Sequence, residues 1–344
     1  MKNRRKKQKI NLKKVLFVIV IVIIAIILIK STNSKKDENV KVSKDHQQDL
    51  TAPEIYLDEK NIFVIGEEFE DNTKATDDVD GDITSKITKT GEVDVNKAGT
   101  YEITYSVTDN AGNTTEKKRE VRVCEALKNG LPVLMYHFFY DQNIKTSGID
   151  NNYIEISKFE EQMKYLSENN FYFPTWEEVE DYIDGKIYLP EKSVVITVDD
   201  GDDSFFELAI PVIQKYNVQA TSFVITSWYG WRANDKQSNI SYQSHSDAMH
   251  VGGANGKGVM LSWSYDQMFE DLKTSSNTLG GATIFCYPFG HYNDLDKQVL
   301  KDAGYKLAFT VNAGRVFKNS PKYELPRVRI SGNTTLTEFK NLVN

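Results

Sequence analysis

The sequence predicts an α/β chain: a (β/α) barrel, incomplete or distorted, preceded by a small all-β Ig-like sandwich and a single N-terminal transmembrane helix. Three observations support this. From Pro132 onward, apolar strand-like runs alternate with helix-like stretches, which is typical of a parallel sheet. Residues 50–124 hold only short strand-like runs between turn signals. An apolar run follows a basic cluster near the N-terminus.

The N-terminal segment is typical of a membrane anchor. Fifteen residues without a polar side chain, Val15 to Ile29, follow a stretch of 14 residues that holds eight Lys or Arg. As a helix the run would reach roughly 22 Å, and snorkelling lysines at its ends extend it toward the ~30 Å hydrocarbon core. A cleaved signal peptide is the alternative, but no convincing cleavage site follows. The positive-inside rule places the N-terminus in the cytoplasm and the chain after Lys30 outside the cell membrane.

Charge and composition limit the classes of protein to which this chain can belong. The net charge is −7, although the first 14 residues are strongly basic, so the remaining body is acidic and argues against nucleic acid as a partner. A 40% hydrophobic content supports a large core. The two cysteines, Cys124 and Cys286, are far apart in the chain, and we expect both to be free and buried, with a disulfide as the alternative.

Residues 50–124 predict an immunoglobulin-like sandwich. Strand-like runs occur at 62–65 and 101–107, and Gly- and Asp-containing turns separate such runs. The stretch from Gly99 to Asn113 resembles the bacterial Ig-like repeats of cell-surface proteins. That resemblance implies contact with the cell wall, but modules of this kind carry no particular activity.

The remainder of the chain predicts repeated strand–helix units. A doubly wound open sheet is the alternative to a barrel, but no glycine-rich phosphate fingerprint follows a strand. The expected strands are 133–136, 194–198, 221–225, 282–286 and 306–311, and the expected helices are 157–169, 204–216, 265–279 and 294–303.

Polar residues at a strand end carry the chemistry. Asp199 and Asp200 end an apolar strand, and His245 and His250 follow about 45 residues later. In parallel α/β barrels the carboxyl ends of the strands hold the active site. One carboxylate and two imidazoles form a ligand set for a catalytic divalent metal, and the second carboxylate is left as a base. If the strand continued through both acids, they would point to opposite sides. The donor set suits Zn²⁺, although cobalt, nickel or iron would fit it as well.

This order of residues resembles the polysaccharide deacetylases, the NodB-homology carbohydrate esterases. Thr197-Val-Asp-Asp-Gly201 is similar to their first motif, and His245-Ser to their histidine motif, with the second histidine one residue later than usual. That spacing, with the Leu131–His137 and Tyr287–Asn293 stretches, is similar to the poly-N-acetylglucosamine deacetylase branch. The resemblance covers roughly residues 131–340. It implies that Asp199 is the general base and that Asp200, His245 and His250 bind the metal.

The histidine spacing constrains the local structure. Residues five apart on an α-helix point about 140° apart, so His245 and His250 cannot face one metal from a regular helix. We therefore expect them on a turn that leaves a strand at 240–244. Asp247 lies between them, where it either orients an imidazole or serves the turn.

The chain departs from the family at two points. Cys286 stands where the third motif usually has an arginine that orients the base, and Arg327 or Arg329 could substitute from another strand. The alternative is that both arginines are surface residues of an edge strand. No histidine follows His291, so the family's late histidine, the usual acid, is missing. His137 is the first candidate for that role and His291 the second.

Other residues are candidates for binding substrate. Backbone N–H groups around Tyr287, Pro288, Phe289 and Gly290 could cradle an oxyanion. Arg327 is grouped with these substrate-binding candidates. Aromatic residues on the loop after strand 221–225 could stack on sugar rings, or could equally serve core packing. These are Trp228, Tyr229 and Trp231.

These features together predict a metal-dependent hydrolase that removes N-acetyl groups from an extracellular N-acetylglucosamine polymer, either poly-N-acetylglucosamine or peptidoglycan, and releases acetate. The alternatives are a non-catalytic carbohydrate-binding surface protein and a glycoside hydrolase that pairs Asp199 with another carboxylate. The predicted organisation is a cytoplasmic basic tail (1–14), a transmembrane anchor (15–30), a linker (31–49), an Ig-like sandwich (50–124) and a catalytic domain (125–344).

Overall fold

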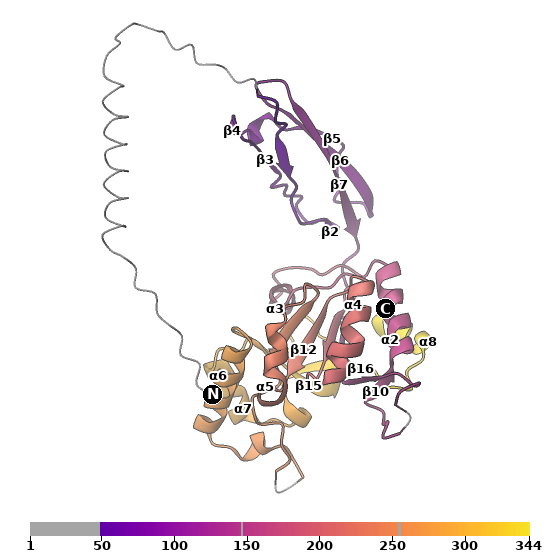
Figure 1. Ribbon diagram of the computed structural model, residues 1–344, viewed down its shortest axis with the longest axis vertical. Helices are drawn as coiled ribbons and strands as arrows, with labels where there is room; N and C mark the ends of the chain where they lie inside the picture. Colours follow the sequence, from indigo (N-terminus) through magenta and orange to yellow (C-terminus); the bar gives the residue numbers. More distant parts are fainter. Residues whose placement is uncertain (1–48, 146, 254–255) are drawn as a thin grey trace, which may run out of the picture. The chain divides into compact units, whose positions relative to one another are not determined.

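The computed structural model describes residues 49–344 apart from 146 and 254–255 (Figure 1). The predicted basic tail, the apolar run 15–30 and nearly all of the linker lie outside the described residues, and so does His46. Within the described part of the chain, no helix has both the length and the apolar character needed to cross a membrane.

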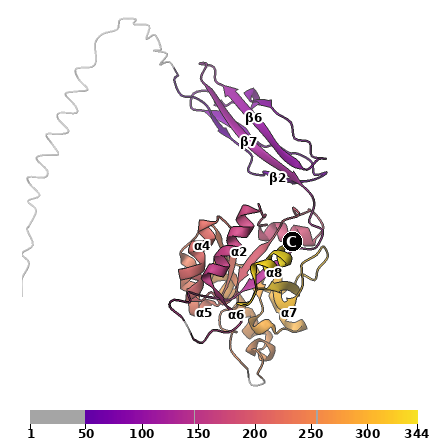
Figure 2. The ribbon, with the colours of Figure 1, turned by 90° about the vertical axis from the view of Figure 1, so that its right-hand side faces the viewer.

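The first module is a sandwich of two sheets, as predicted. Its four-stranded sheet is dominated by two long antiparallel strands, β6 (Gly99–Thr108) and β7 (Thr114–Cys124), which lie side by side in Figures 1 and 2. Alternate residues of β6 (Ile103, Tyr105 and Val107) are buried, so one face of this sheet forms the core. The three-stranded sheet has the order β1 (Glu54–Tyr56), β3 (Lys74–Asp77), β4 (Gly81–Asp82), followed in the chain by the 3-10 helix η1 (Thr84–Lys86). The four-stranded sheet has the order β2 (Ile62–Val64), β7 (Thr114–Cys124), β6 (Gly99–Thr108), β5 (Thr88–Thr90).

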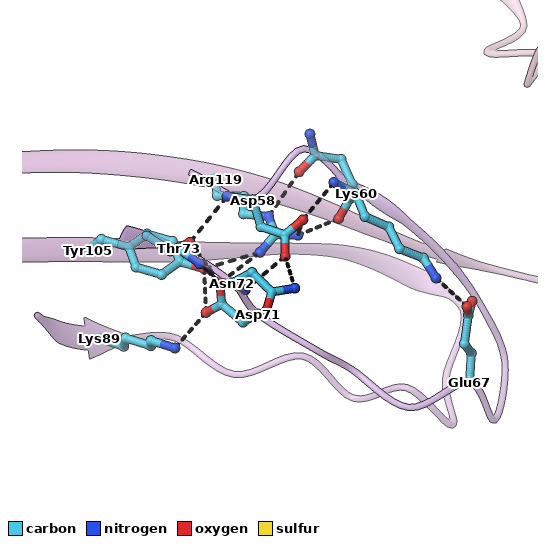
Figure 3. Close-up of polar contacts among 10 residues, drawn as sticks. Asp58, Lys60, Glu67, Asp71, Asn72, Thr73, Lys89, Tyr105 and Arg119 are labelled. Carbon is cyan, nitrogen blue, oxygen red and sulfur yellow. Dashed lines mark hydrogen bonds and ion pairs between the residues drawn. The ribbon is translucent and has the colours of Figure 1, made fainter. Parts of the chain in front are cut away.

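A buried arginine organises polar contacts in this sandwich (Figure 3). Arg119 on β7 is 2% exposed, and its guanidinium donates to Asp71 (3.1 Å), to Asn61 (3.0 Å) and to the Lys60 carbonyl. Asp71 also accepts from Lys89 at 2.6 Å. The guanidinium is therefore desolvated but has several acceptors, as a buried charge requires. The sequence analysis did not find this network, because its members are scattered over about 60 residues.

The second module is a closed barrel of parallel strands, so the doubly wound alternative is wrong. Among the described residues the barrel has seven strands, one fewer than a complete (β/α)₈ barrel. The pairing of the last strands shifts register between Phe309 and Ala313, which matches the expected distortion. The strand order is β11 (Val195–Val198), β12 (Ala220–Val224), β13 (Ile240–Ser244), β14 (Ile284–Cys286), β15 (Leu307–Ala313), β16 (Leu325–Arg329), β8 (Val133–Tyr136).

Strand β16 closes this barrel between β15 and β8. The alternative that placed Arg327 on an edge strand is therefore wrong. Each predicted strand is present within about two residues of its expected ends. Four of the barrel strands, β8, β11, β12 and β14, are short runs that are buried throughout.

Helices follow most barrel strands, and the four expected ones are present. The expected helix 204–216 begins as a π-helical turn, η2 (Phe205–Ala209), and continues as α4 (Ile210–Lys215). Helices α3, α6, α7 and α8 each begin with a capping box, which fixes their first turn. The others are α2 (Ile156–Glu168), α3 (Trp176–Ile183), α5 (Thr226–Tyr229), α6 (Tyr265–Thr278), α7 (Asp294–Asp302) and α8 (Leu336–Val343). Shorter elements are β9 (Phe138–Tyr140), β10 (Tyr153–Glu155), and the 3-10 helices η3 (Gly230–Asn234), η4 (Val259–Ser262) and η5 (Pro288–Gly290).

The fold places the sequence-predicted polar residues at one end of the barrel. Because all the strands are parallel, the residues after β8, β11, β13 and β14 meet at the carboxyl ends of the strands. Cys124 and Cys286 are both buried and free, as expected.

The Arg119–Asp71 pair should stabilise the sandwich selectively. Hydrogen bonds from Lys89, Thr73 and Tyr105 outweigh the opposing effect of burial and lower the pKa of Asp71 from 3.8 to about 2. This contribution to stability is therefore present above pH ~4 and is lost as the pH falls through about 2. Asp71→Asn should destabilise residues 50–124 by about 3 kcal/mol at neutral pH, because it removes the hydrogen-bonded carboxylate from a buried guanidinium and leaves only Asp58, at 3.8 Å.

Hydrogen exchange of peptides from residues 50–124 in the full chain measures this loss. All 4 tryptophans lie after residue 124, so their fluorescence reports unfolding of the barrel alone and should not change. Glu102→Gln, which removes the exposed Lys118–Glu102 pair, is the control and should leave the exchange of these peptides unchanged. If both variants lost the same protection against hydrogen exchange, burial of the Arg119–Asp71 pair would contribute nothing to the stability of the sandwich.

Candidate active site

The two adjacent carboxylates lie in one site. Strand β11 ends at Val198, and Asp200 has a left-handed backbone (φ 73°), so strand alternation does not extend through the acids. Ligand atoms of Asp199 and of Asp200 each lie within 4.8 Å of a ligand atom of His245. Both acids are buried. Asp199 and Asp200 therefore converge on His245 instead of pointing to opposite sides, because the strand does not continue through them.

The two histidines leave β13 on a turn, as their spacing predicted. The Nε2 atoms of His245 and His250 each lie 3.4 Å from Oδ1 of Asp200. Ser246, between them, has φ 73°, which breaks any helical continuation. Nδ1 of His245 lies 2.7 Å from the carbonyl oxygen of Cys286. Because a carbonyl can only accept, Nδ1 carries a proton. Burial opposes a charged ring, but the contacts with Cys286 and Asp200 outweigh it and raise the pKa of His245, so Nε2 would bind a metal only after losing its proton.

Asp247 serves the turn rather than an imidazole. Its carboxylate accepts from the Thr226 hydroxyl at 2.6 Å. The Cys286 carbonyl, which the sequence analysis did not consider, is the group that orients His245.

The residues present fit a divalent metal. Oδ1 of Asp200 is buried and has no hydrogen-bond partner among the described residues, although two imidazole nitrogens face it. An unpartnered buried carboxylate oxygen is costly, and a cation would satisfy it. Burial, reinforced by the neighbouring His245, lowers the pKa of His250 to about 4, so this ring is neutral near pH 7 and its lone pair is available.

A second group of potential ligands, Asp199, His245 and Cys286, is less suitable. Both oxygens of Asp199 already accept from a guanidinium, and the Cys286 sulfur lies 3.0 Å from the same group. A cation at this position would face a fixed positive charge at close range. The Asp200, His245 and His250 group is therefore the candidate metal site.

Arg327 holds Asp199. It comes from β16, is completely buried, and donates to both Asp199 oxygens at 2.7 Å. It also donates to the Thr310 carbonyl at 2.9 Å and to the Thr197 hydroxyl at 3.1 Å. Burial opposes ionisation of Asp199, but the guanidinium outweighs it and holds the pKa of Asp199 well below its usual value. The base is therefore ionised.

Arg327 does not have the expected substrate-binding role, and the two candidate arginines differ in their burial and their partners. Arg327 cannot contact a substrate, because its side chain is fully buried beneath Asp199. The thiol of Cys286 lies where the family's arginine would begin, 3.6 Å from Asp199 Oδ2, and it leaves room for the guanidinium to arrive from β16. Arg329 is exposed and donates to Asn152, so for this residue the surface alternative holds.

The structure separates the two candidate acids. His137 follows β8, and its Nε2 lies 3.7 Å from Asp199 Oδ2. Burial lowers the pKa of His137, although Asp199 and Asp200 oppose that shift. Nδ1 of His291 instead accepts from the Gly258 amide at 3.0 Å, which engages it with a neighbouring loop. His137 is thus beside the base, and His291 is held elsewhere.

The segment after β14 is only partly available for substrate. The Tyr287 amide donates to the Phe309 carbonyl, the Gly290 amide donates to Tyr287, and Pro288 has no N–H. Of the four residues expected to supply backbone donors to an oxyanion, this leaves only the N–H of Phe289. The Tyr287 ring is buried and donates to the Tyr323 carbonyl, so it cannot contact a ligand.

Two exposed rings flank His250. Phe289 adopts φ 59° and stacks on His250, with ring centroids 4.3 Å apart. Gly290 has φ 71°, and a Cβ there would lie 2.3 Å from Val311, so this tight turn requires glycine.

Trp228 packs edge-on against His250 at 5.8 Å and is half exposed. Trp231 is also exposed but lies over Arg232, and the Tyr229 hydroxyl is directed to Asp202 at 3.4 Å.

Asp271, a buried carboxylate on α6 that bonds the amides of Asp247 and Ala248, was not among the residues predicted from the sequence. The signal that could have found it is an acid on the apolar face of a helix, among the buried residues Met268, Leu272 and Ser275.

Comparisons with known proteins agree with this site. A model of the polysaccharide deacetylase family matches residues 186–308, and a model of the Ig-like domain of bacterial surface proteins matches residues 53–123. A poly-beta-1,6-N-acetyl-D-glucosamine N-deacetylase of Staphylococcus aureus is 30% identical over 234 residues, covering 62% of this chain and 77% of that protein.

Solved structures are also similar to the barrel of this chain. The Streptococcus pyogenes deacetylase PplD in complex with acetate is similar with a TM-score of 0.56 and 25% identity, covering 62% of this chain and 98% of that one. IcaB from Ammonifex degensii is similar in fold, with a TM-score of 0.52 and 24% identity over 63% of this chain and 97% of that one. With an Ig-like module before a barrel that carries these motifs, the chain belongs to the polysaccharide deacetylase family.

Proposed function

We propose that this enzyme is a metal-dependent N-deacetylase that hydrolyses N-acetyl groups of an extracellular poly-N-acetylglucosamine and releases acetate. One observation carries the proposal: the unpartnered Oδ1 of Asp200 lies between two imidazoles, beside an Asp199 that Arg327 keeps ionised. The named activity of the Staphylococcus aureus relative supports this substrate class. Peptidoglycan carries the same N-acetyl group and is the alternative substrate.

Asp200, His245 and His250 would hold the metal, and Zn²⁺ suits two nitrogens and one oxygen. A divalent metal supplies Lewis acidity when bound, because it lowers the pKa of a water molecule and polarises a carbonyl. Asp199 accepts the proton of the attacking water. The rigid pair with Arg327 fixes the direction of the Asp199 lone pairs and keeps them charged.

His137 passes to the leaving amine the proton that Asp199 takes from the water, because burial lowers its own pKa and leaves the ring neutral until it receives that proton. It is the histidine beside Asp199, 3.7 Å away, and its side chain is 19% exposed, so it can face both the base and a ligand. The amide of Phe289 lies on the loop that stacks on His250 and is the remaining main-chain donor for an oxyanion in that segment.

The rings of Trp228 and Phe289 contact the sugar. Both are exposed and both pack against His250, so a pyranose lying on either ring is next to the metal ligands. The Ig-like module is similar to modules of bacterial surface proteins, and the apolar run 15–29 is typical of an anchor. We therefore place the enzyme on the outer face of the cell membrane, near the cell wall, where deacetylation adds positive charge to the polymer.

Acetate release from N-acetylglucosamine oligomers tests this function. The chain should release acetate without shortening the oligomer, and a chelator should abolish the reaction. Asp199→Asn should lower kcat by about 10²–10⁴ and still bind metal, whereas Asp200→Asn should lose the metal. Oligomer shortening would indicate a glycoside hydrolase, and binding without acetate would indicate a carbohydrate-binding protein.

Arg327 should be required for both folding and activity. Arg327→Gln leaves Asp199 buried without its cation and should destabilise the barrel by about 3–5 kcal/mol, measured by tryptophan fluorescence in urea. Arg329→Gln, on the exposed side of the same strand, is the matched control and should stay within about 0.5 kcal/mol. The role given to Arg327 is wrong if the two variants are equally stable and equally active.

Trp228 should contribute to substrate affinity. Trp228→Ala removes a stacking face worth about 1 kcal/mol and should raise KM for a long oligomer roughly fivefold, with little change in metal affinity. Trp231→Ala, equally exposed but packed on Arg232, should leave KM unchanged. The reverse pattern would move the sugar site away from His250.

A further inference from the structure

The turn that carries the two candidate histidine ligands is held from both sides. Between His245 and His250 the chain forms neither helix nor strand. A segment of this kind keeps a fixed shape only if its amides and carbonyls find partners. The spacing of the two imidazoles therefore depends on the elements packed against residues 246–249.

Asp271 on α6 supplies partners for two consecutive amides. Its Oδ1 accepts from the Asp247 N–H at 2.8 Å, and its Oδ2 accepts from the Ala248 N–H at 2.7 Å. The side chain is buried, with 7% of its surface exposed. Each carboxylate oxygen thus has one amide, and both amides belong to the turn between the histidines.

Ser275, one turn further along α6, supports the same segment. Its hydroxyl lies 2.8 Å from that of Ser244, which in turn accepts from the Ser246 amide at 3.1 Å. Both serines are fully buried. Residues four apart on a helix share a face, so one face of α6 contacts the turn at two points.

Helix α5 holds the opposite side of the turn. The amides of Thr226 and Ser227 donate to the carbonyls of Ser246 and Asp247 at 3.1 and 3.2 Å. The turn therefore has two amides bonded to Asp271 on α6 and two carbonyls bonded to α5. Neither helix contributes a metal ligand, so these contacts bear on the geometry of the site.

We propose that Asp271 is a positioning residue that fixes the distance between His245 and His250 and thereby sets the metal affinity of the site. This inference rests on the proposed metal site. Each Asp271 oxygen accepts one amide, whereas asparagine would place an NH2 donor against one of those two N–H groups, which explains an aspartate rather than its neutral analogue.

The free-energy cost of burying the Asp271 carboxylate also indicates that this residue has a function. Among the described residues no Lys or Arg forms an ion pair with Asp271, and burial raises its pKa to about 6 even though both amides oppose that shift. An acid that only packed α6 against the barrel would be replaced at lower cost by an apolar side chain.

Metal titration of the full chain tests the proposal. After the protein is stripped with chelator, Zn²⁺ binding is measured by calorimetry and Co²⁺ binding by its visible absorption. Asp271→Asn should weaken Zn²⁺ binding by about 10–100-fold and change the Co²⁺ spectrum, because the ligands lose their spacing. Ser275→Ala should weaken it by a smaller factor, and it keeps the test open if Asp271→Asn does not fold.

Asp296→Asn is the matched control. Asp296 is also a buried acid with a pKa raised to about 6 by burial, but it accepts an amide at the start of its own helix, α7. This variant should lose stability without loss of metal affinity.

Wild-type Zn²⁺ affinity and Co²⁺ spectrum in Asp271→Asn, with a stability loss like that of Asp296→Asn, would overturn the positioning role alone. A wild-type protein that binds neither metal would instead overturn the metal site, and this inference with it.

Discussion

The buried pair of Arg327 and Asp199 is the interaction on which the site depends. It joins β16 to β11 across β8, so it forms only when the barrel closes. Burying two charges is costly, and the cost is offset here by a bidentate contact and by the Thr197 and Thr310 oxygens. The pair therefore links the closure of the fold to the charge state of the catalytic base.

Two adjacent aspartates acquire different roles because their surroundings differ. Asp199 has its charge matched by a guanidinium, whereas Oδ1 of Asp200 faces two imidazole nitrogens at 3.4 Å and has no hydrogen-bond partner among the described residues. The first arrangement yields a stable anion, and the second a place for a cation. The left-handed backbone at Asp200 lets consecutive residues serve one site, which a continuing strand would prevent.

The Ig-like module uses the same device for stability alone. Arg119 is buried and bonded to Asp71 and to main-chain oxygen, as Arg327 is bonded to Asp199 and to a carbonyl. What distinguishes the two is their surroundings. Only the pair in the barrel has imidazoles and an unpartnered oxygen as neighbours, so only that pair contributes to chemistry.

Sequence alone determined what is local: the strand and helix runs, the motif that ends β11, and the turn that the His245–His250 spacing demands. It also narrowed the partner of the base to Arg327 or Arg329 but could not choose, because residues two apart on a strand share a face. Only the closed barrel shows that Arg327 bonds Asp199, while Arg329, at the end of β16, is exposed and bonds Asn152. The placement of Asp271, the Cys286 carbonyl and His137 likewise required tertiary structure. These contacts join residues that are tens of positions apart, and the sequence pattern specifies periodicity and spacing along the chain, not which distant elements pack together.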